Sequence, residues 1–167
     1  LESYDVVQGA RVLDAYAGSG ALGCEALSRG AASVEFVEKH PKACEVTRRN
    51  VAATSKTATG VTRVTQGSAQ SYVAVHSGPW DLVFLDPPYA FTQDQVLDIL
   101  RVIAPNLAEG AIVVVERSSR DAEPAWNSQL RRFAMKKYGE TVLYYLEPDE
   151  SYAGAGSEPA ESESASC

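Results

Sequence analysis

Asp86-Pro87-Pro88-Tyr89 is the stretch whose residue types most clearly indicate chemistry. It follows the apolar run at residues 82–85, which is typical of a short buried strand, so it should lie where that strand ends. The Asp86 carboxylate and the Pro87 carbonyl offer hydrogen-bond acceptors that the prolines preorganise, and Tyr89 offers a flat ring for stacking. A planar base with an exocyclic amino group needs both features, because two acceptors on its N–H bonds help to localise the nitrogen lone pair. The alternative is a Pro-Pro loop that only caps the strand.

A second motif, Asp14-Ala-Tyr-Ala-Gly-Ser-Gly-Ala-Leu-Gly23, also follows a predicted strand and has the spacing G-x-G-x-x-G. Such a turn brings backbone amides close to a ligand. Glu38 ends the next predicted strand, where an acid accepts from the ribose hydroxyls of either NAD or S-adenosylmethionine. Asp14 favours the latter, because a carboxylate repels a pyrophosphate but can partner a cationic amino group or a sulfonium. A dinucleotide site and a purely structural turn are the alternatives.

Together the two motifs predict an enzyme that places a methyl group on a base nitrogen. The transfer is an in-line displacement at a sulfonium, so that positioning carries much of the rate. It needs neither a covalent enzyme intermediate nor a metal.

The elements that must position these motifs alternate between strand and helix. Such alternation implies parallel pairing with right-handed crossovers. Two further extended runs, joined at Gly139-Glu140, predict a closing antiparallel hairpin. We therefore expect an α/β fold with a mostly parallel seven-stranded sheet and helices on both faces. The predicted strands are residues 12–15, 33–38, 61–65, 81–85, 111–116, 132–138 and 141–147, and the predicted helices are residues 21–28, 41–54, 69–76 and 93–104.

Charge is distributed unevenly along the 167 residues, whose net charge is −7. From Glu147 onward the chain holds six of its 22 acids and none of its 15 bases, which leaves 16 acids against 15 bases, or −1, in the rest. The chain therefore lacks the strong overall positive charge that attracts nucleic-acid phosphates, but it can still carry a local basic face. We predict one domain over residues 1–148 and a disordered acidic tail over residues 149–167.

Cysteine usage and hydropathy bear on location. The three cysteines, Cys24, Cys44 and Cys167, form no metal-ligand pattern or disulfide framework. No apolar stretch approaches the roughly 20 residues of a membrane span. A reducing, cytoplasmic setting fits best.

Several single residues carry weaker signals. Phe91 could stack on a base or pack in the core, and Glu116 ends the fifth predicted strand, where we favour simple capping over a role in the site. Four basic residues near the hairpin could contact phosphates or could keep the strand edges solvated; these are Arg131, Arg132, Lys136 and Lys137.

The stretch from Asp14 to Ala31, with its Ala-Leu-Ser-Arg-Gly extension, resembles the cofactor motif of the bacterial 16S ribosomal RNA guanine-N2 methyltransferases. That family also carries an Asp-Pro-Pro-aromatic motif, which Asp86 to Tyr89 match and which adenine-N6 DNA methyltransferases share. The resemblance implies a Rossmann-like class I methyltransferase fold and S-adenosylmethionine as methyl donor. It also implies that the substrate is a guanine N2 in 16S ribosomal RNA, methylated by a monomer within an assembling small ribosomal subunit.

The resemblance also assigns roles by position. It implies catalytic roles for Asp86, Pro87 and Tyr89, and substrate contacts for Pro88, Tyr89 and Phe91. The implied cofactor contacts are Asp14, Tyr16, Ala17, Gly18, Ser19, Gly20, Glu38, Lys39, Ser68, Ala69 and Asp86.

Two departures from the family pattern matter. Relatives often have Asp or Asn where Ser68 stands, so the family pattern supports an adenine contact at this position less than it does the other cofactor contacts. We also expect that the family's N-terminal extension is missing, in which case the chain would bind the cofactor without binding RNA. A DNA adenine-N6 methyltransferase, a non-catalytic binding module and an NAD-dependent oxidoreductase are the competing functions.

Overall fold

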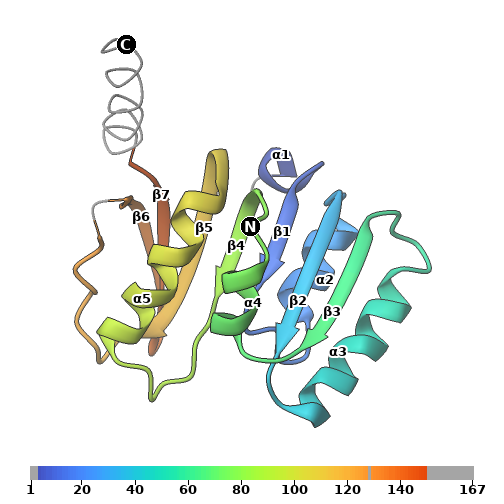
Figure 1. The fold of residues 1–167 in the computed structure, drawn as a ribbon, viewed down its shortest axis with the longest axis horizontal. Coiled ribbons are helices and arrows are strands. Elements are labelled where there is room, and N and C mark those ends of the chain that lie inside the picture. The colour runs from blue at the N-terminus through green and yellow to red at the C-terminus, as the bar shows by residue number, and fades with distance from the viewer. Residues whose placement is uncertain (1–3, 128, 150–167) are drawn as a thin grey trace, which may run out of the picture.

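The computed structural model describes residues 4–149 except residue 128, and these residues form a seven-stranded sheet with the order β3-β2-β1-β4-β5-β7-β6 (Figure 1). The first five strands pair in parallel, and the last two pair antiparallel. The strands are β1 (Arg11–Asp14), β2 (Ser33–Glu38), β3 (Val61–Gln66), β4 (Trp80–Leu85), β5 (Leu107–Ser118), β6 (Leu130–Tyr138) and β7 (Thr141–Pro148).

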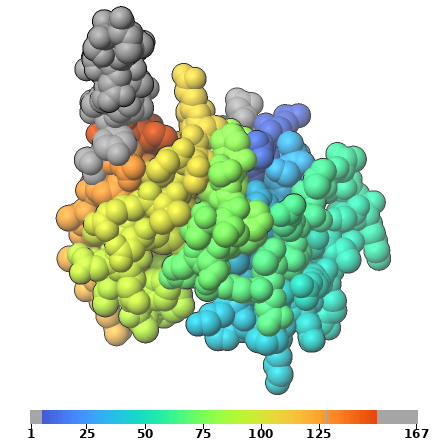
Figure 2. All heavy atoms as spheres, viewed as in Figure 1, coloured from blue at the N-terminus to red at the C-terminus, as the bar shows by residue number. Residues whose placement is uncertain are grey.

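Helices connect the parallel strands and cover both faces of the sheet. In Figure 1, α4 and α5 lie in front of the sheet and α2 lies behind it. The space-filling view shows α4 and α5 covering the middle of the near face (Figure 2). The helices are α1 (Tyr4–Val7), α2 (Ala21–Ser28), α3 (Pro41–Thr54), α4 (Ala69–Val75) and α5 (Gln93–Ile103), and a short 3-10 helix, η1 (Ala104–Asn106), follows α5.

Each face of the sheet has its own apolar core, because successive residues of a buried strand point to opposite sides. Leu13, Val83 and Val113 pack beneath α4 and α5, whereas Val12 and Phe36 pack beneath α2 and α3. Burial on both faces explains why these strands are nearly continuous apolar runs.

Close packing of α2 on β2 depends on Gly23. A Cβ atom at this position would lie 2.3 Å from Cε1 of Phe36, whose side chain is fully buried. A larger residue would therefore force α2 away from the sheet.

The predicted parallel sheet and its closing hairpin are confirmed, and β2, α2 and α3 have the predicted bounds. The largest difference is β5, which was predicted over residues 111–116 and begins at Leu107. Its first residues, Leu-Ala-Glu-Gly, lack the apolar pattern of a buried strand, and Leu107 pairs with Trp80 before a shift in register. The short helix α1 was not predicted. The predicted acidic tail lies outside the described residues, apart from Asp149.

Cys24 and Cys44 are buried free thiols, and Trp80 is fully buried with its indole nitrogen donating to Glu35. None of the helices described is long and apolar enough to cross a membrane.

Candidate functional site

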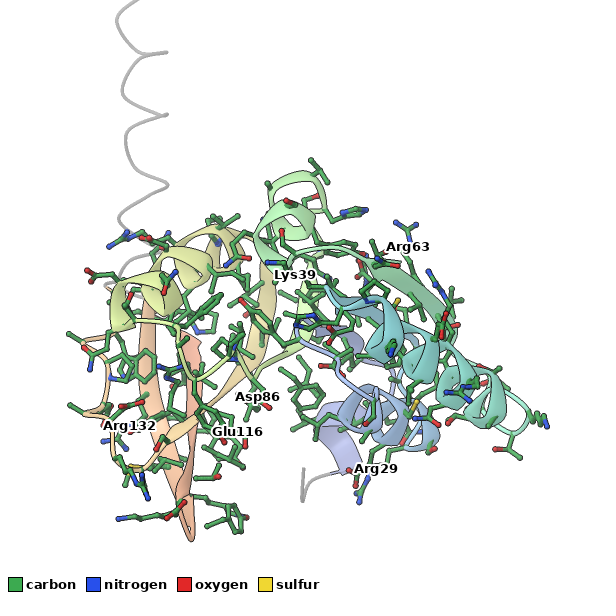
Figure 3. The ribbon with its side chains drawn as sticks, turned by 90° about the horizontal axis from the view of Figure 1, so that it is seen from below. Arg29, Lys39, Arg63, Asp86, Glu116 and Arg132 are labelled. Carbon is green, nitrogen blue, oxygen red and sulfur yellow. The ribbon has the colours of Figure 1, made fainter. Side chains whose placement is uncertain are left out.

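The two motifs meet at one edge of the sheet because β1 and β4 are parallel neighbours, with Asp14 beside Phe84. The glycine turn follows β1 and the Asp-Pro-Pro-Tyr loop follows β4, so both lie at the carboxyl ends of the parallel strands, where open sheets bind ligands. Figure 3 looks onto this edge, with Lys39 and Asp86 labelled. Both loops line one cavity of about 550 Å³, which is formed by Ala15, Tyr16, Gly18, Glu38, Lys39, His40, Gly67, Ser68, Ala69, Gln70, Asp86, Pro88, Phe91 and Gln95.

The glycine turn is held rigidly by its neighbours. Gly20 precedes α2 with a φ of 82°, in the left-handed region that favours glycine. From α3, the Thr47 hydroxyl donates to the Gly18 carbonyl at 2.7 Å, and the Asn50 amide donates to the Ser19 carbonyl at 2.8 Å. These bonds leave the turn preorganised beside the cavity.

Glu38, the last residue of β2, is the acid that faces the cavity from the second strand. One carboxylate oxygen accepts from the Gly18 amide and the other from the His40 amide, each at 2.8 Å. The two bonds fix the carboxylate at the cavity wall. Each oxygen keeps a lone pair for a further donor, so the group can accept from two vicinal hydroxyls, as a ribose presents them.

Asp14 lies beneath the turn rather than in the cavity wall. It is 3% exposed, and its carboxylate accepts from the Gly23 amide at 3.1 Å. Burial is the main cause that raises the pKa of Asp14 to about 7, and the Gly23 bond opposes that rise. Its predicted contact with a cationic part of the cofactor stays a prediction.

Tyr16 joins the two loops. Its ring packs edge-on against Phe91, with centroids 5.9 Å apart and planes at 86°. Its hydroxyl is buried and finds no hydrogen-bond partner among the described residues. Burial raises the pKa of Tyr16 to about 12, so the hydroxyl is a neutral donor at the cavity and fits a polar group of a ligand.

The Asp-Pro-Pro-Tyr loop is a tight turn. The Pro88 carbonyl accepts from the Phe91 amide at 2.9 Å, which places Tyr89 at the tip of the turn with 76% of its surface exposed. The Thr92 hydroxyl then caps α5 by accepting from the Gln95 amide. The turn therefore presents the Tyr89 ring to solvent, free to stack on a base.

Asp86 has a second carboxylate beside it. Figure 3 shows Asp86 and Glu116 next to each other at the carboxyl edge of the sheet. Partial burial of its carboxyl group, the Glu116 charge and a hydrogen bond with Glu116 raise the pKa of Asp86 to about 6. The cationic Arg117 opposes this rise. Our preference for Glu116 as a simple capping residue missed this contact.

Arg117 is a second residue that the sequence did not single out. Its side chain is 5% exposed, and its guanidinium donates to the Phe91 carbonyl at 2.8 Å. One signal was available in the sequence. Ala111, Val113 and Val115 alternate along the buried face of β5, and Arg117 continues that alternation with a charge.

The structure brings most of the predicted site residues to the cavity. Ser68 lines it but uses its hydroxyl as the cap of α4, accepting from the Ser71 amide at 3.1 Å. The binding roles predicted for Ser68 and for the other residues that line the cavity remain predictions. The predicted residues outside the cavity wall are Asp14, Ala17, Ser19, Gly20, Pro87 and Tyr89.

Arg131 and Arg132, two basic residues near the hairpin, form ion pairs with acidic residues. Arg131 pairs with Glu147 at 2.7 Å and Arg132 pairs with Glu123 at 2.8 Å. These pairs support the view of this strand as a solvated edge more than as a free cationic face.

Known proteins are similar to this chain in both fold and sequence. A solved structure from Streptococcus pyogenes, "conserved hypothetical protein", has a TM-score of 0.76 and 32% identity, and the match covers 86% of this chain and 88% of that one. The structure titled "Putative methyltransferase yhhF", from Escherichia coli, has a TM-score of 0.75 and 30% identity over 87% of this chain and 79% of that one. These similarities confirm the predicted Rossmann-like class I methyltransferase fold.

A curated relative adds a named activity. Ribosomal RNA small subunit methyltransferase D of Escherichia coli K12 is 34% identical over 121 residues, which is 71% of this chain and 59% of the relative. The chain thus spans just under three fifths of that relative's length. A family model described as "Conserved hypothetical protein 95" matches residues 1–147, and the chain therefore belongs to that family.

Proposed function

We propose that this chain transfers a methyl group from S-adenosylmethionine to the exocyclic N2 of a guanine in 16S ribosomal RNA. One observation carries the proposal: a carboxylate suited to a ribose, Glu38, and a carboxylate suited to an amino group, Asp86, line the same cavity. A dinucleotide site explains the first carboxylate but not the second. A capping loop explains Asp86 as a turn residue but not why it lines the same cavity as Glu38. The name of the Escherichia coli relative supports ribosomal RNA as the substrate.

The cavity residues fit the parts of S-adenosylmethionine. Glu38 would hold the ribose hydroxyls, and the turn at Gly18 would hold the methionine end, where the buried Tyr16 hydroxyl can donate to a carboxylate. Ser68 and Ala69 would border the adenine. When bound, S-adenosylmethionine supplies an electrophilic methyl carbon on a sulfonium.

The loop after β4 would hold the guanine. Tyr89 would stack on the base, a contact worth about 1–3 kcal/mol, and the amino group would donate to Asp86 and to the Pro87 carbonyl. The base has to leave its stack to reach this loop, which suits a single-stranded or bulged segment of RNA. We further propose that the substrate is an assembling small subunit in the cytoplasm and that the enzyme acts as a monomer.

The test is transfer of a labelled methyl group by this chain. We expect labelling of 16S ribosomal RNA in assembling small subunits, at guanine N2, and none of duplex DNA. Labelling of DNA alone would favour an adenine-N6 methyltransferase instead. Calorimetric titration with S-adenosylhomocysteine and with NAD accompanies the assay. Tighter binding of NAD would overturn the proposal, and binding of S-adenosylhomocysteine without any transfer would indicate a non-catalytic module.

A further inference from the structure

The carboxylate of Glu116 occupies an unusual position for a charged group. The strands β4 and β5 are parallel neighbours with Leu85 beside Val115. The next residue along each chain segment is therefore Asp86, directly after β4, and Glu116, within β5. The negative charge of Glu116 raises the pKa of Asp86, as expected for two neighbouring carboxylates. The ion pairs of the described residues do not include Glu116. Its partner is thus a like-charged group at the site.

Glu116 also opens onto a second hollow, on the α2 side of the sheet. This hollow has a volume of about 330 Å³, which is large enough for several waters, and Glu116 is the one carboxylate among its described lining residues. Tyr138, Thr141 and Tyr145 also line it, and their side chains carry hydroxyls that can bond to water. Glu116 therefore connects the acceptor loop on one side with a solvent-sized space on the other.

We infer that Glu116 and Asp86 form one proton-accepting pair, which takes the proton that the target amino group loses and passes it to water in the hollow lined by Glu116. This inference rests on the proposed function. It gives Glu116 a catalytic part that the chain's sequence alone did not indicate.

The step balances as follows. The guanine amino nitrogen bonds to the methyl carbon while the carbon–sulfur bond breaks, and the electron pair of that bond stays on sulfur. The nitrogen is then cationic, with one proton more than the methylated product. Two adjacent ionised carboxylates repel each other, so the pair accepts this proton readily and shares it. The proton leaves through Glu116, which restores both carboxylates.

Other charged groups around the pair set its proton affinity. Arg117 lowers the pKa of Asp86 from the α5 side, and the charge of Asp86 in turn raises the pKa of Asp14 on β1. Lys136 lies on the same face as Glu116, one strand beyond Leu143. Tyr138 lines the hollow. Replacing Glu116 changes the pair while leaving these groups in place.

Two measurements test the inference, with Glu116→Gln against Glu116→Asp. In single-turnover transfer with saturating cofactor, we expect Glu116→Gln to be at least tenfold slower at pH 7. In the pH–rate profile, we expect the midpoint of its acid limb, where transfer falls as pH drops, to lie about one pH unit lower. Glu116→Asp should keep the wild-type midpoint. Carbon-13 NMR of labelled carboxyl groups, which needs no activity, should show Asp86 titrating at lower pH in Glu116→Gln than in the wild type.

Glu109→Gln is the matched control, since it removes an exposed carboxylate from the same strand and should change neither measurement. An active wild type with an unchanged acid limb and an unchanged Asp86 titration in Glu116→Gln would overturn the inference alone. A wild type that binds S-adenosylhomocysteine and methylates no RNA would overturn the proposed function, and the inference with it.

Discussion

The guanidinium of Arg117 donates a hydrogen bond of 2.8 Å to the carbonyl of Phe91, which ties β5 to the loop that carries Asp86 and Tyr89. The side chain is buried beneath that loop, and its charge also lowers the pKa of Asp86. A single residue thus fixes the shape of the acceptor loop and tunes its carboxylate.

Replacing Arg117 should therefore affect stability and pH dependence together. Arg117→Met leaves the Phe91 carbonyl without its donor, which costs about 1–3 kcal/mol in the free energy of unfolding. It also removes the cation that opposes the raised pKa of Asp86, so the acid limb of methyl transfer should move to higher pH. Urea unfolding and a pH–rate profile check the two effects. The control Arg120→Met, at an exposed position nearby, should change neither, and an unmoved acid limb in Arg117→Met would contradict the electrostatic role.

Asp86 should matter for transfer far more than for cofactor binding. The Asp86→Ala variant loses an acceptor for the target amino group but leaves the contacts of Glu38 intact. We expect affinity for S-adenosylhomocysteine to change less than about threefold, while transfer falls by about 10²–10⁴-fold. In the wild type, transfer should fall as pH drops through about 6, where Asp86 becomes protonated. Calorimetry measures the cofactor affinity and labelled transfer measures the activity, with Asp98→Ala on the exposed side of α5 as control. Full transfer in Asp86→Ala would remove Asp86 from the mechanism.

Glu38 should show the opposite split. The amide nitrogen of Glu38→Gln would face one of the two backbone N–H groups that now donate to the carboxylate, and one ribose acceptor would be lost. We expect S-adenosylhomocysteine to bind about 10–100-fold more weakly, a loss of about 1.4–2.7 kcal/mol. Glu45→Gln on the exposed surface of α3 should bind normally in the same calorimetric titration. Equal affinities for the two variants would show that Glu38 does not contact the cofactor.

Sequence patterns predicted the parts of this site whose chemistry is local. Glycine spacing, an acid at a strand end and two prolines are visible in the chain, and the alternation of elements places them at one edge of the sheet. The partners of Asp86 were not predictable in the same way. Whether Glu116 points at Asp86 depends on the β4–β5 register, in which Leu85 lies beside Val115, and that register is a property of the assembled sheet.

The same limit explains the misjudged start of β5 and the missed role of Arg117. Residues 107–110 are half-buried or exposed and so carry no apolar alternation, although they are part of the strand. An arginine is usually exposed, so Arg117 is taken for a surface residue from its type alone. Its alternation with Val113 and Val115 is what places it on the buried face of the strand. Hydrophobic patterns thus show where the core is, and they are silent where a strand leaves the core or buries a charge.

Gly23 provides a test of the packing beneath the site. The Gly23→Ala variant gains about 1 kcal/mol of helix propensity, yet its Cβ would lie 2.3 Å from Phe36 in a fully buried contact. Overpacking of this kind costs about 1–3 kcal/mol, so we expect a net loss of up to about 2 kcal/mol in urea unfolding. Gly67→Ala is the control, because a Cβ there meets nothing within 4 Å. A Gly23→Ala variant that is more stable than the wild type would show that α2 can shift without penalty.

Asp14 should make stability depend on pH in a direction opposite to that of most paired acids. Its pKa is raised from 3.8 to about 7 by burial, so between these values the folded state binds more protons than the unfolded state. The free energy of unfolding must then fall as pH rises through this window. The fall is on the order of a few kcal/mol, since one pKa unit corresponds to about 1.4 kcal/mol.

The Asp14→Asn variant isolates this effect. Its amide oxygen can still accept from Gly23, but the group no longer ionises. We therefore expect urea unfolding between pH 4 and pH 8 to show the wild type losing stability relative to Asp14→Asn as pH rises. Asp81→Asn is the control for a carboxylate that also accepts from a backbone amide but is less buried, because Asp81 accepts from the Arg11 amide at an exposed site. Parallel stability curves for the wild type and Asp14→Asn would mean that Asp14 is already ionised in the folded protein, and that the turn at Gly23 stabilises the charge.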